Sequence, residues 1–244
     1  MILLAFAAAL AGPPEASPQP DLSDDRVRLA TQLDVLDALV DNGMAEQAMA
    51  MVAEMHKQGA DDPRIDVAQG RAMHQRGLDH DAERALEAAV KRAPRSGDAW
   101  SALGVLQADL GKLPAAEASL SKAVKFEPKN PDIQNNYGFV LLAVGKPELA
   151  IPAFQAALAA DPSSTRARNN LGFAYVRLDR YDEALEMFRA ASAEPDARYN
   201  FGVACEQHGD RAAALTSYQA AVTAQPGHAL AVVALSRLLK EGSP

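Results

Sequence analysis

The chain has 244 residues, of which 48% are apolar and 5% are aromatic, and it carries a formal net charge of −8. This acidic balance leaves no basic surface for nucleic acid, and the single cysteine, Cys205, excludes both an internal disulfide and a zinc site made of cysteines. An alanine-rich, aromatic-poor composition favours closely packed helices over a β-sandwich.

The N-terminal segment is predicted to be a signal peptide over residues 1–11. Residues 2–11 are a continuous apolar run that is too short to span a bilayer, and Ala9-Leu10-Ala11 forms a small-x-small cleavage site. No positively charged residue precedes the run, so an incorrectly assigned start codon is the alternative. Residues 12–28, rich in proline, are predicted to be an extended linker.

From residue 29 onward the chain repeats with a period of 34 residues. Blocks begin at Leu29, Pro63, Gly97, Pro131 and Thr165, and a last block begins early, at Pro195. Position 8 is glycine in every block except the first, and position 15 is glycine in every block except the fifth. Position 20 is alanine in all six, namely Ala48, Ala82, Ala116, Ala150, Ala184 and Ala214. Such self-similarity is the signature of stacked supersecondary units.

Each block is predicted to fold as two helices joined by a short turn. In the fourth block, Asn130 precedes Pro131 and Asp132, which is an N-cap followed by proline and an acid in the first turn. Gly145 stands where the first helix needs a left-handed residue at its end. Small residues at positions 8 and 20 are expected to let two antiparallel helices cross closely, because a larger side chain would overpack there.

Two features near the C-terminus depart from the regular repeat. From Ala157 to Gly172 the separation is 15 residues, but from Ala191 to Gly202 it is only 11, so four residues are missing. We expect a shortened connection and a local change in superhelical pitch, since four residues are close to one helical turn. Residues 229–244 are predicted to form a capping helix that covers the last pair with Leu230, Val233, Leu235 and Leu238.

The repeat resembles the tetratricopeptide repeat, a 34-residue helix-turn-helix unit. The third block carries Trp100, Leu103, Gly104, Gly111, Ala116, Leu120, Ala123 and Pro128 at positions of the family pattern, and the fourth and fifth blocks match at similar positions. The resemblance implies an all-α, right-handed solenoid with a C-terminal capping helix. Its six repeats would be residues 29–62, 63–96, 97–130, 131–164, 165–194 and 195–228.

The same resemblance implies a concave groove lined by the first helix of each repeat. The candidate peptide-binding residues at its groove positions are Asn135, Asn136, Phe139, Arg166, Asn169, Asn170, Phe173, Arg177, Tyr199 and Asn200. Position 6 is asparagine in three successive repeats, at Asn136, Asn170 and Asn200. Because asparagine is a mediocre helix former, it either bonds the preceding repeat or holds the backbone of an extended peptide.

Residues that could carry chemistry are few, and no enzyme, cofactor or metal site is predicted. The sequence has neither a phosphate-binding glycine loop nor a His-Glu-x-x-His motif. Met44, Met49, Met51 and Met55, beside His56, resemble soft copper ligands but equally a flexible core filler. Cys205, at position 11 of its block, is predicted to be a small buried core residue.

We therefore expect a non-catalytic adaptor or assembly factor that binds a protein or peptide partner. With an export signal, the arrangement is similar to periplasmic bacterial tetratricopeptide repeat proteins that assist pilus or secretin assembly. Those are typically lipoproteins, but Pro13 stands where lipid attachment needs a cysteine, so no lipid anchor is expected. The alternatives are a cytoplasmic scaffold with a misassigned start and a metal-binding periplasmic protein. The sequence leaves the partner and the oligomeric state open.

Overall fold

A computed structural model describes residues 22–241 of the chain. Within these residues all regular structure is α-helical, which confirms the predicted fold class. The helices are α1 (Leu22–Asp41), α2 (Ala45–Lys57), α3 (Pro63–Gln75), α4 (Asp79–Arg92), α5 (Gly97–Asp109), α6 (Leu113–Phe126), α7 (Pro131–Ala143), α8 (Pro147–Ala160), α9 (Thr165–Val176), α10 (Tyr181–Ala191), α11 (Glu194–His208), α12 (Arg211–Ala224) and α13 (Ala229–Glu241). None of these helices is both long enough and apolar enough to cross a membrane. The predicted signal peptide, residues 1–11, lies outside the described residues.

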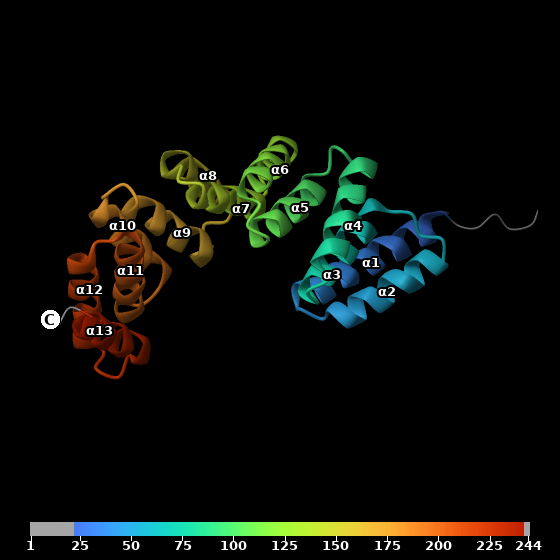
Figure 1. Ribbon diagram of the computed structural model, residues 1–244. Helices are drawn as coiled ribbons and strands as arrows, with labels where there is room; N and C mark the ends of the chain where they lie inside the picture. The colour runs from blue at the N-terminus through green and yellow to red at the C-terminus, as the bar shows by residue number, and fades with distance from the viewer. Residues whose placement is uncertain (1–21, 242–244) are drawn as a thin grey trace, which may run out of the picture.

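The helices stack in pairs into a curved array (Figure 1). Figure 1 shows the chain following an arc from α1 at one end to α13 at the other, with α5, α7 and α9 toward the inner side. Contacts between helices agree with this view, because each of α1, α3, α5, α7 and α9 packs against the next odd-numbered helix as well as its sequence neighbours. The inner surface of the arc is therefore built by the first helices of the pairs.

The N-terminal end differs from the sequence prediction. Helix α1 begins at Leu22, so the segment 22–28, predicted as part of an extended linker, is helical. The physical reason is that Pro20 is the last proline before α1, and every residue of α1 can donate a backbone N–H. The hydroxyl of Thr31 donates to the carbonyl of Val27, four residues earlier, within this helix.

The turns within the pairs depend on residues with positive φ. Gly111 and Gly145 have φ values of 71° and 77°, which confirms the left-handed residues predicted at position 15. In the fifth block this position holds Asp179, and its φ is 58°. An aspartate tolerates this region better than most side chains, so the turn keeps its shape without glycine.

The close helix crossing is confirmed, and the structure shows which side chain fills it. All six position-20 alanines are fully buried. The space beside each position-8 glycine is taken by the large residue at position 24 of the second helix. A Cβ atom built on Gly138 would lie 2.7 Å from a ring carbon of Phe154, and one on Gly202 would lie 2.6 Å from a ring carbon of Tyr218. The glycines are therefore required by an aromatic or leucine side chain that lies directly on the backbone.

The four-residue deletion shortens the joint between α10 and α11, as predicted. Only residues 192 and 193 separate these helices, whereas residues 161–164 separate α8 from α9. Glu194 stabilises the joint, because it accepts hydrogen bonds from Arg189 at 2.8 and 2.9 Å and from Arg198 at 2.8 Å. These two guanidinium groups lower the pKa of Glu194 to about 2.

The capping helix α13 covers the last pair with a different face from the one predicted. Leu238 is buried and Leu235 packs against the core, as expected, together with Ala231 and Ala234. Leu230 and Val233 are 61% and 65% exposed, so the prediction that they cover the last pair is wrong. A helix can turn only one stripe toward α12, and the small residues at 231 and 234 allow the closer approach.

Replacing Ala150 by leucine should destabilise the chain much more than replacing Ala159 by leucine. Ala150 is fully buried at the helix crossing, whereas Ala159 is exposed on the same helix, α8. Overpacking at the crossing should cost about 1–3 kcal/mol, and the exposed change should cost close to nothing. Urea unfolding of the two variants measures the difference, and equal midpoints would show that the crossing is not close.

Candidate binding site on the concave face

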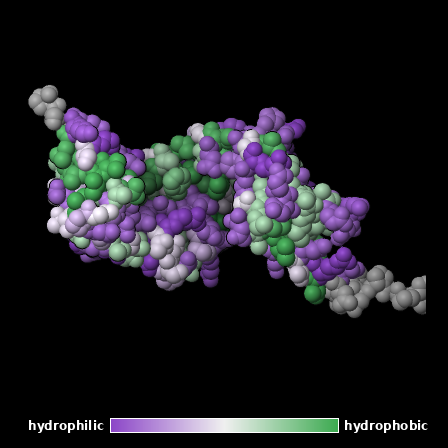
Figure 2. All heavy atoms as spheres, turned by 90° about the horizontal axis from the view of Figure 1, so that it is seen from below, coloured by the Kyte–Doolittle hydropathy of each residue, from purple (hydrophilic) through white to green (hydrophobic). Residues whose placement is uncertain are grey.

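Two hollows lie next to each other on the inner surface, on either side of Phe139. The larger, of about 290 Å³, is lined by Val105, Ala108, Asp109, Leu120, Asn135, Asn136, Phe139, Val140, Arg166 and Asn170. The smaller, of about 160 Å³, is lined by Phe139, Leu142, Ala143, Phe173, Arg177, Ala204 and Gln207. Figure 2, which views the molecule from below the arc, shows apolar surface gathered over the middle of the array with polar surface around it.

Phe139 borders both hollows and is unusually open for a phenylalanine. Its side chain projects from α7 and is 52% exposed. Phe173, at the same position one repeat later, is half-buried, and its ring meets that of Phe188 edge-to-face with a centroid distance of 5.5 Å. The two predicted phenylalanines thus lie on one surface, with Phe139 the more available of the pair.

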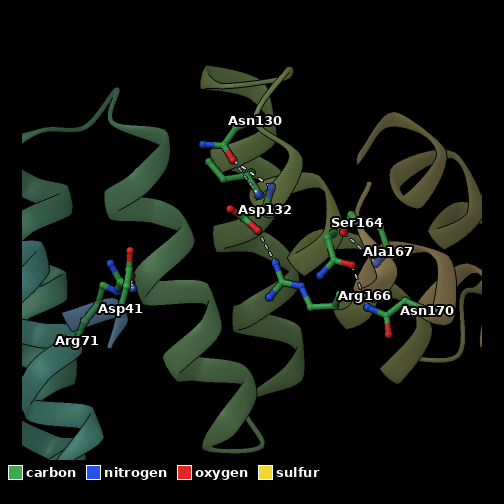
Figure 3. A network of polar contacts seen from close by, with 10 residues as sticks. Asp41, Arg71, Asn130, Asp132, Ser164, Arg166, Ala167 and Asn170 are labelled. Atoms are coloured by element: carbon green, nitrogen blue, oxygen red, sulfur yellow. Dashed lines mark hydrogen bonds and ion pairs between the residues drawn. The ribbon is translucent and has the colours of Figure 1, made fainter. Parts of the chain in front are cut away.

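Asparagines line the larger hollow, but the three at position 6 do not act alike. Asn170 donates from its side-chain amide to the side-chain oxygen of Asn135 in the preceding repeat, at 2.9 Å. Figure 3 shows Asn170 in this polar network between neighbouring repeats. For Asn170, therefore, the hydrogen bond to the preceding repeat accounts for the asparagine. Asn136 lines the same hollow, and within residues 22–241 its side chain makes no hydrogen bond.

The equivalent bond is missing one repeat later. Asn169 occupies the position of Asn135, and its side-chain oxygen is buried without a hydrogen-bond partner among the described residues. Asn200 occupies the position of Asn170, but no side-chain hydrogen bond of Asn200 is present in the described part of the chain. The shortened joint between α10 and α11 lies between these two residues and changes how the repeats meet. Neither Asn169 nor Asn200 lines either hollow.

The two predicted arginines differ in their availability. Arg166 forms an ion pair with Asp132 of the preceding repeat, as Figure 3 shows. Arg177 lines the smaller hollow and is exposed, and within residues 22–241 its guanidinium has no ion-pair partner. The free positive charge of this face therefore lies at Arg177 and not at Arg166.

Tyr199 lies apart from the hollows. Its ring packs against Tyr218 and His228, with centroid distances of 5.8 and 5.4 Å. Tyr199 therefore joins α11 to the C-terminal end of the array. Of the ten predicted site residues, seven line the two hollows, and Asn169, Tyr199 and Asn200 do not.

Several lining residues were not among the candidates. Val105, Ala108 and Asp109 contribute to the larger hollow from α5. The groove positions implied by the family resemblance are 2, 5, 6, 9, 12 and 13 of each block. These three residues stand at positions 9, 12 and 13 of the third block, so the same rule applied one block earlier identifies them. Leu120 and Val140 reach the hollow from positions that this rule leaves out.

Other residues considered for chemistry belong to the core. Cys205 is fully buried, as predicted, and burial raises the pKa of its thiol to about 12. Met55 is buried, and Met49 and Met51 pack against the same N-terminal core, whereas Met44 is 41% exposed. Among the described residues, no group of three or more histidine, cysteine or acidic side chains is placed to hold a metal ion.

Known proteins share this arrangement of helix pairs. A family model for the tetratricopeptide repeat (TPR) domain of cytochrome c-type biogenesis protein H matches residues 63–197, which is more than half of the chain. A second model, for the tetratricopeptide repeat itself, matches residues 174–229. The chain belongs to the TPR family. No curated protein matches it at a significant level.

Solved TPR structures resemble the fold. The crystal structure of YrrB, described as a TPR protein with an unusual peptide-binding site, is 24% identical, with a TM-score of 0.59 over 75% of this chain and 96% of that one. Two structures of MamA are 24% and 23% identical, with TM-scores of 0.55 and 0.57. They cover 66% and 68% of this chain and 96% and 93% of their own. At these identities the likeness concerns the fold alone.

A histidine links two TPR units beside the larger hollow. His74 on α3 bonds Asp79 of its own repeat through Nδ1 at 2.8 Å and Asp109 of the next repeat through Nε2 at 3.0 Å. Burial lowers the pKa of His74, but the two carboxylates outweigh this effect and raise the pKa above its ordinary value of 6.5. A protonated His74 can donate to both carboxylates at once.

Replacing His74 by glutamine should destabilise the chain more in acid than in base. Since the folded pKa is raised, protonated His74 contributes stability that is fully present below the unfolded pKa of about 6.5 and is lost as pH rises through the folded pKa. The difference should be up to about 1 kcal/mol for a partly exposed group. Urea unfolding at about pH 5.5 and about pH 8.5 measures it. His80→Gln, at an exposed position, is the matched control, and parallel pH profiles for the two variants would contradict the assignment.

Asn170→Ala should lower stability, and Asn136→Ala should not. Asn170 loses one hydrogen bond to Asn135, worth about 0.5–1.5 kcal/mol, whereas Asn136 gives up no internal bond and alanine is the better helix former. A double-mutant cycle on Asn135 and Asn170 should return a coupling energy of similar size. Equal losses in the Asn136→Ala and Asn170→Ala variants would mean that position 6 has the same structural role in both repeats.

Proposed function

We propose that this TPR chain is a non-catalytic adaptor that binds a peptide segment or a helix of a partner protein on its concave face. The observation that carries the proposal is Phe139, which is 52% exposed and has a hollow on each side. Full burial of an exposed phenylalanine is worth about 1.5–3 kcal/mol, and Phe139, being half exposed, forfeits about half of this energy. A partner that covers Phe139 recovers this energy, and exposed apolar surface with a polar rim is typical of interaction sites.

The lining of the hollows indicates what the occupant offers. Apolar side chains would enter the larger hollow beside Val105 and Val140 and the smaller one beside Leu142. The amide of Asn136 has both donors and its acceptor available for backbone or polar groups of the occupant. Arg177 favours an occupant with a carboxylate near the smaller hollow. An apolar segment with a nearby acidic group fits this set.

A more specific form of the proposal is a role in the biogenesis of c-type cytochromes in the cell envelope. Its support is the family model for cytochrome c-type biogenesis protein H over residues 63–197. The occupant would be a cytochrome polypeptide before haem attachment, which carries a C-x-x-C-H motif. The comparisons lend no support to pilus or secretin assembly. Finding the full-length, unprocessed chain in the cytosol would favour the cytoplasmic scaffold and rule out export.

Phe139→Asp should weaken binding of a haem-free c-type cytochrome polypeptide at least tenfold, which corresponds to about 1.4 kcal/mol. The aspartate removes the apolar contact between the two hollows, and burying its charge under a bound partner costs free energy. Fluorescence anisotropy of the labelled polypeptide, titrated with wild-type and variant chain, measures the change. Leu149→Asp is the matched control, because Leu149 is 58% exposed on α8 and lines neither hollow.

Two results would count against the proposal in different ways. Equal affinity of the wild-type and Phe139→Asp chains would exclude the concave face as the binding surface. No binding of the haem-free polypeptide to the wild-type chain would exclude the cytochrome form alone. In that case, crosslinking in the source cells with the same two variants still tests the adaptor role, because only Phe139→Asp should lose the crosslinked partner.

A further inference from the structure

The last position of the groove, position 13, carries opposite charges two repeats apart. Asp109 is the last residue of α5, Arg177 follows the end of α9, and Ala143, exposed at the end of α7, stands between them in the array. Equal positions of neighbouring first helices lie side by side, because Asp132 and Arg166, both at position 2, form an ion pair (Figure 3). Asp109 and Arg177 therefore lie along one edge of the concave face.

Asp109 borders the larger hollow, and one oxygen of its carboxylate is free. Its Oδ2 bonds Nε2 of His74 at 3.0 Å, whereas within residues 22–241 no donor contacts its Oδ1. The side chain of Asp109 is 55% exposed. His74 also bonds Asp79, so one imidazole ring faces two carboxylates and can balance only one negative charge even when it is protonated. The larger hollow therefore keeps negative charge at this edge.

Arg166, the positive charge of the same hollow, lies at the opposite edge. It stands at position 2, and the distance from position 2 to position 13 is about 16 Å along a helix axis. Asp132 pairs with Arg166 and balances its charge. Arg177 borders the smaller hollow and has no ion-pair partner among the described residues. Along the position-13 edge, the unbalanced charge thus changes from negative at Asp109 to positive at Arg177.

Apolar surface lies between these two charges. Phe139 separates the hollows, Leu142 lines the smaller one, and the short side chain of Ala143 leaves the way from one hollow to the other open. Helix α7 packs against both α5 and α9. Neighbouring packed helices lie about 8–10 Å apart, so two such steps place the charges roughly 16–20 Å from each other.

The amide of Asn136 favours an extended occupant over a helical one. It lines the larger hollow, and within residues 22–241 its donors and its acceptor have no hydrogen-bond partner. The backbone N–H and C=O groups of a helix bond each other, whereas those of an extended segment need outside partners. A side-chain amide with two donors and an acceptor meets that need.

We propose that the concave face binds an extended segment of a partner protein, with a basic residue at Asp109, an acidic residue about six positions away at Arg177, and apolar residues between them. An extended chain rises about 3.3 Å per residue, so six residues cover about 20 Å. Alternate side chains point to the same side, so the two alternate apolar residues between the charged ones enter the two hollows. This occupant presupposes the proposed adaptor role, whose test with Phe139→Asp does not involve Asp109.

Short synthetic peptides with this pattern provide the probe. The peptide KSLQLSE, labelled with fluorescein, carries lysine, two leucines and glutamate at alternate positions, and ESLQLSE and KSLQLSK each differ from it at one end. Fluorescence anisotropy with the full-length chain gives the dissociation constants. At about 0.1 M salt, charges more than about 10 Å apart are largely screened. The ratio of two dissociation constants is the readout, because a loss of folded chain changes both equally.

The wild-type chain should bind KSLQLSE about fivefold more tightly than ESLQLSE, because an ion pair with Asp109 replaces a repulsion between like charges. The Asp109→Asn variant should bind the two peptides about equally, and Asp109→Lys should reverse their order. The matched control is Asp79→Asn. Asp79 bonds the same histidine but lines neither hollow, so this variant should keep the wild-type ratio.

The other end of the occupant is tested in the same way. The wild-type chain should bind KSLQLSE about fivefold more tightly than KSLQLSK, and Arg177→Glu should reverse this order. The matched control is Arg180→Gln, because Arg180 pairs with Glu183 and lines neither hollow. Circular dichroism melting checks that all the variants remain folded.

Several results would overturn this orientation. An Asp109→Asn variant that keeps the wild-type ratio would remove Asp109 from the site, and no saturable binding of KSLQLSE up to its solubility limit would exclude the sequence pattern. Neither result touches the adaptor role, which depends on the cytochrome polypeptide and Phe139→Asp. Equal affinity of the wild-type and Phe139→Asp chains for KSLQLSE would instead exclude the concave face, and the proposed function with it.

Other occupants give distinct outcomes. A helical peptide with lysine and glutamate about twelve positions apart spans a similar length, about 18 Å. If it binds the wild-type chain at least tenfold more tightly than KSLQLSE, the occupant is a helix and the extended pattern is wrong. A wild-type dimer in sedimentation equilibrium that Phe139→Asp converts to a monomer would mean that a second copy covers the groove.

Discussion

The close crossing of two helices at position 8 is the constraint on which the rest of the molecule depends. Glycine there leaves room for a large side chain from the second helix, as when Phe154 lies on the backbone of Gly138. The contact joins each pair into one unit, but it leaves apolar edges that a single pair cannot bury. Stacking on the next pair buries them, so the units are stable only as neighbours. Because the first helices of successive pairs also contact one another, they form the inner surface of the arc.

The regular stacking decides which polar groups remain available for a partner. Where the repeat is intact, side chains bond between neighbours, as Asn170 does with Asn135 and Arg166 with Asp132. Lysines of the turns do the same, since Lys112 pairs with Glu83 and Lys146 with Glu117, each one repeat back. Each of these exposed ion pairs contributes little stability. Each one, however, neutralises a charge that the sequence alone would suggest is unpaired. What lines the two hollows is largely apolar, and the polar lining residues Asn136, Arg177 and Gln207 have no side-chain partner within residues 22–241.

Irregularities of the array coincide with its open groups. The short joint between α10 and α11 separates Asn169 from Asn200 and leaves the buried oxygen of Asn169 without a partner among the described residues. At the C-terminal end, α13 keeps the repeat register, and Leu230 and Val233 on its outer side are 61% and 65% exposed. At the short joint, a position that forms a hydrogen bond in the preceding repeat has none among the described residues, because the shortened connection changes how the two repeats meet.

Sequence patterns alone predict the all-α class, the helix pairs, the left-handed residues at Gly111 and Gly145, the burial of the position-20 alanines and the burial of Cys205. Apart from the single cysteine, these features repeat about every 34 residues, and they follow from local rules of helix capping, backbone conformation and side-chain size. The pairing of individual polar side chains and the packing face of α13 follow only from the tertiary structure. Which asparagine bonds its neighbour, which arginine is paired, and which face of α13 packs all depend on the distance and angle between adjacent units. That geometry is set by the packing of whole helices across the joint, and a four-residue change at one joint alters it without altering the local pattern on either side.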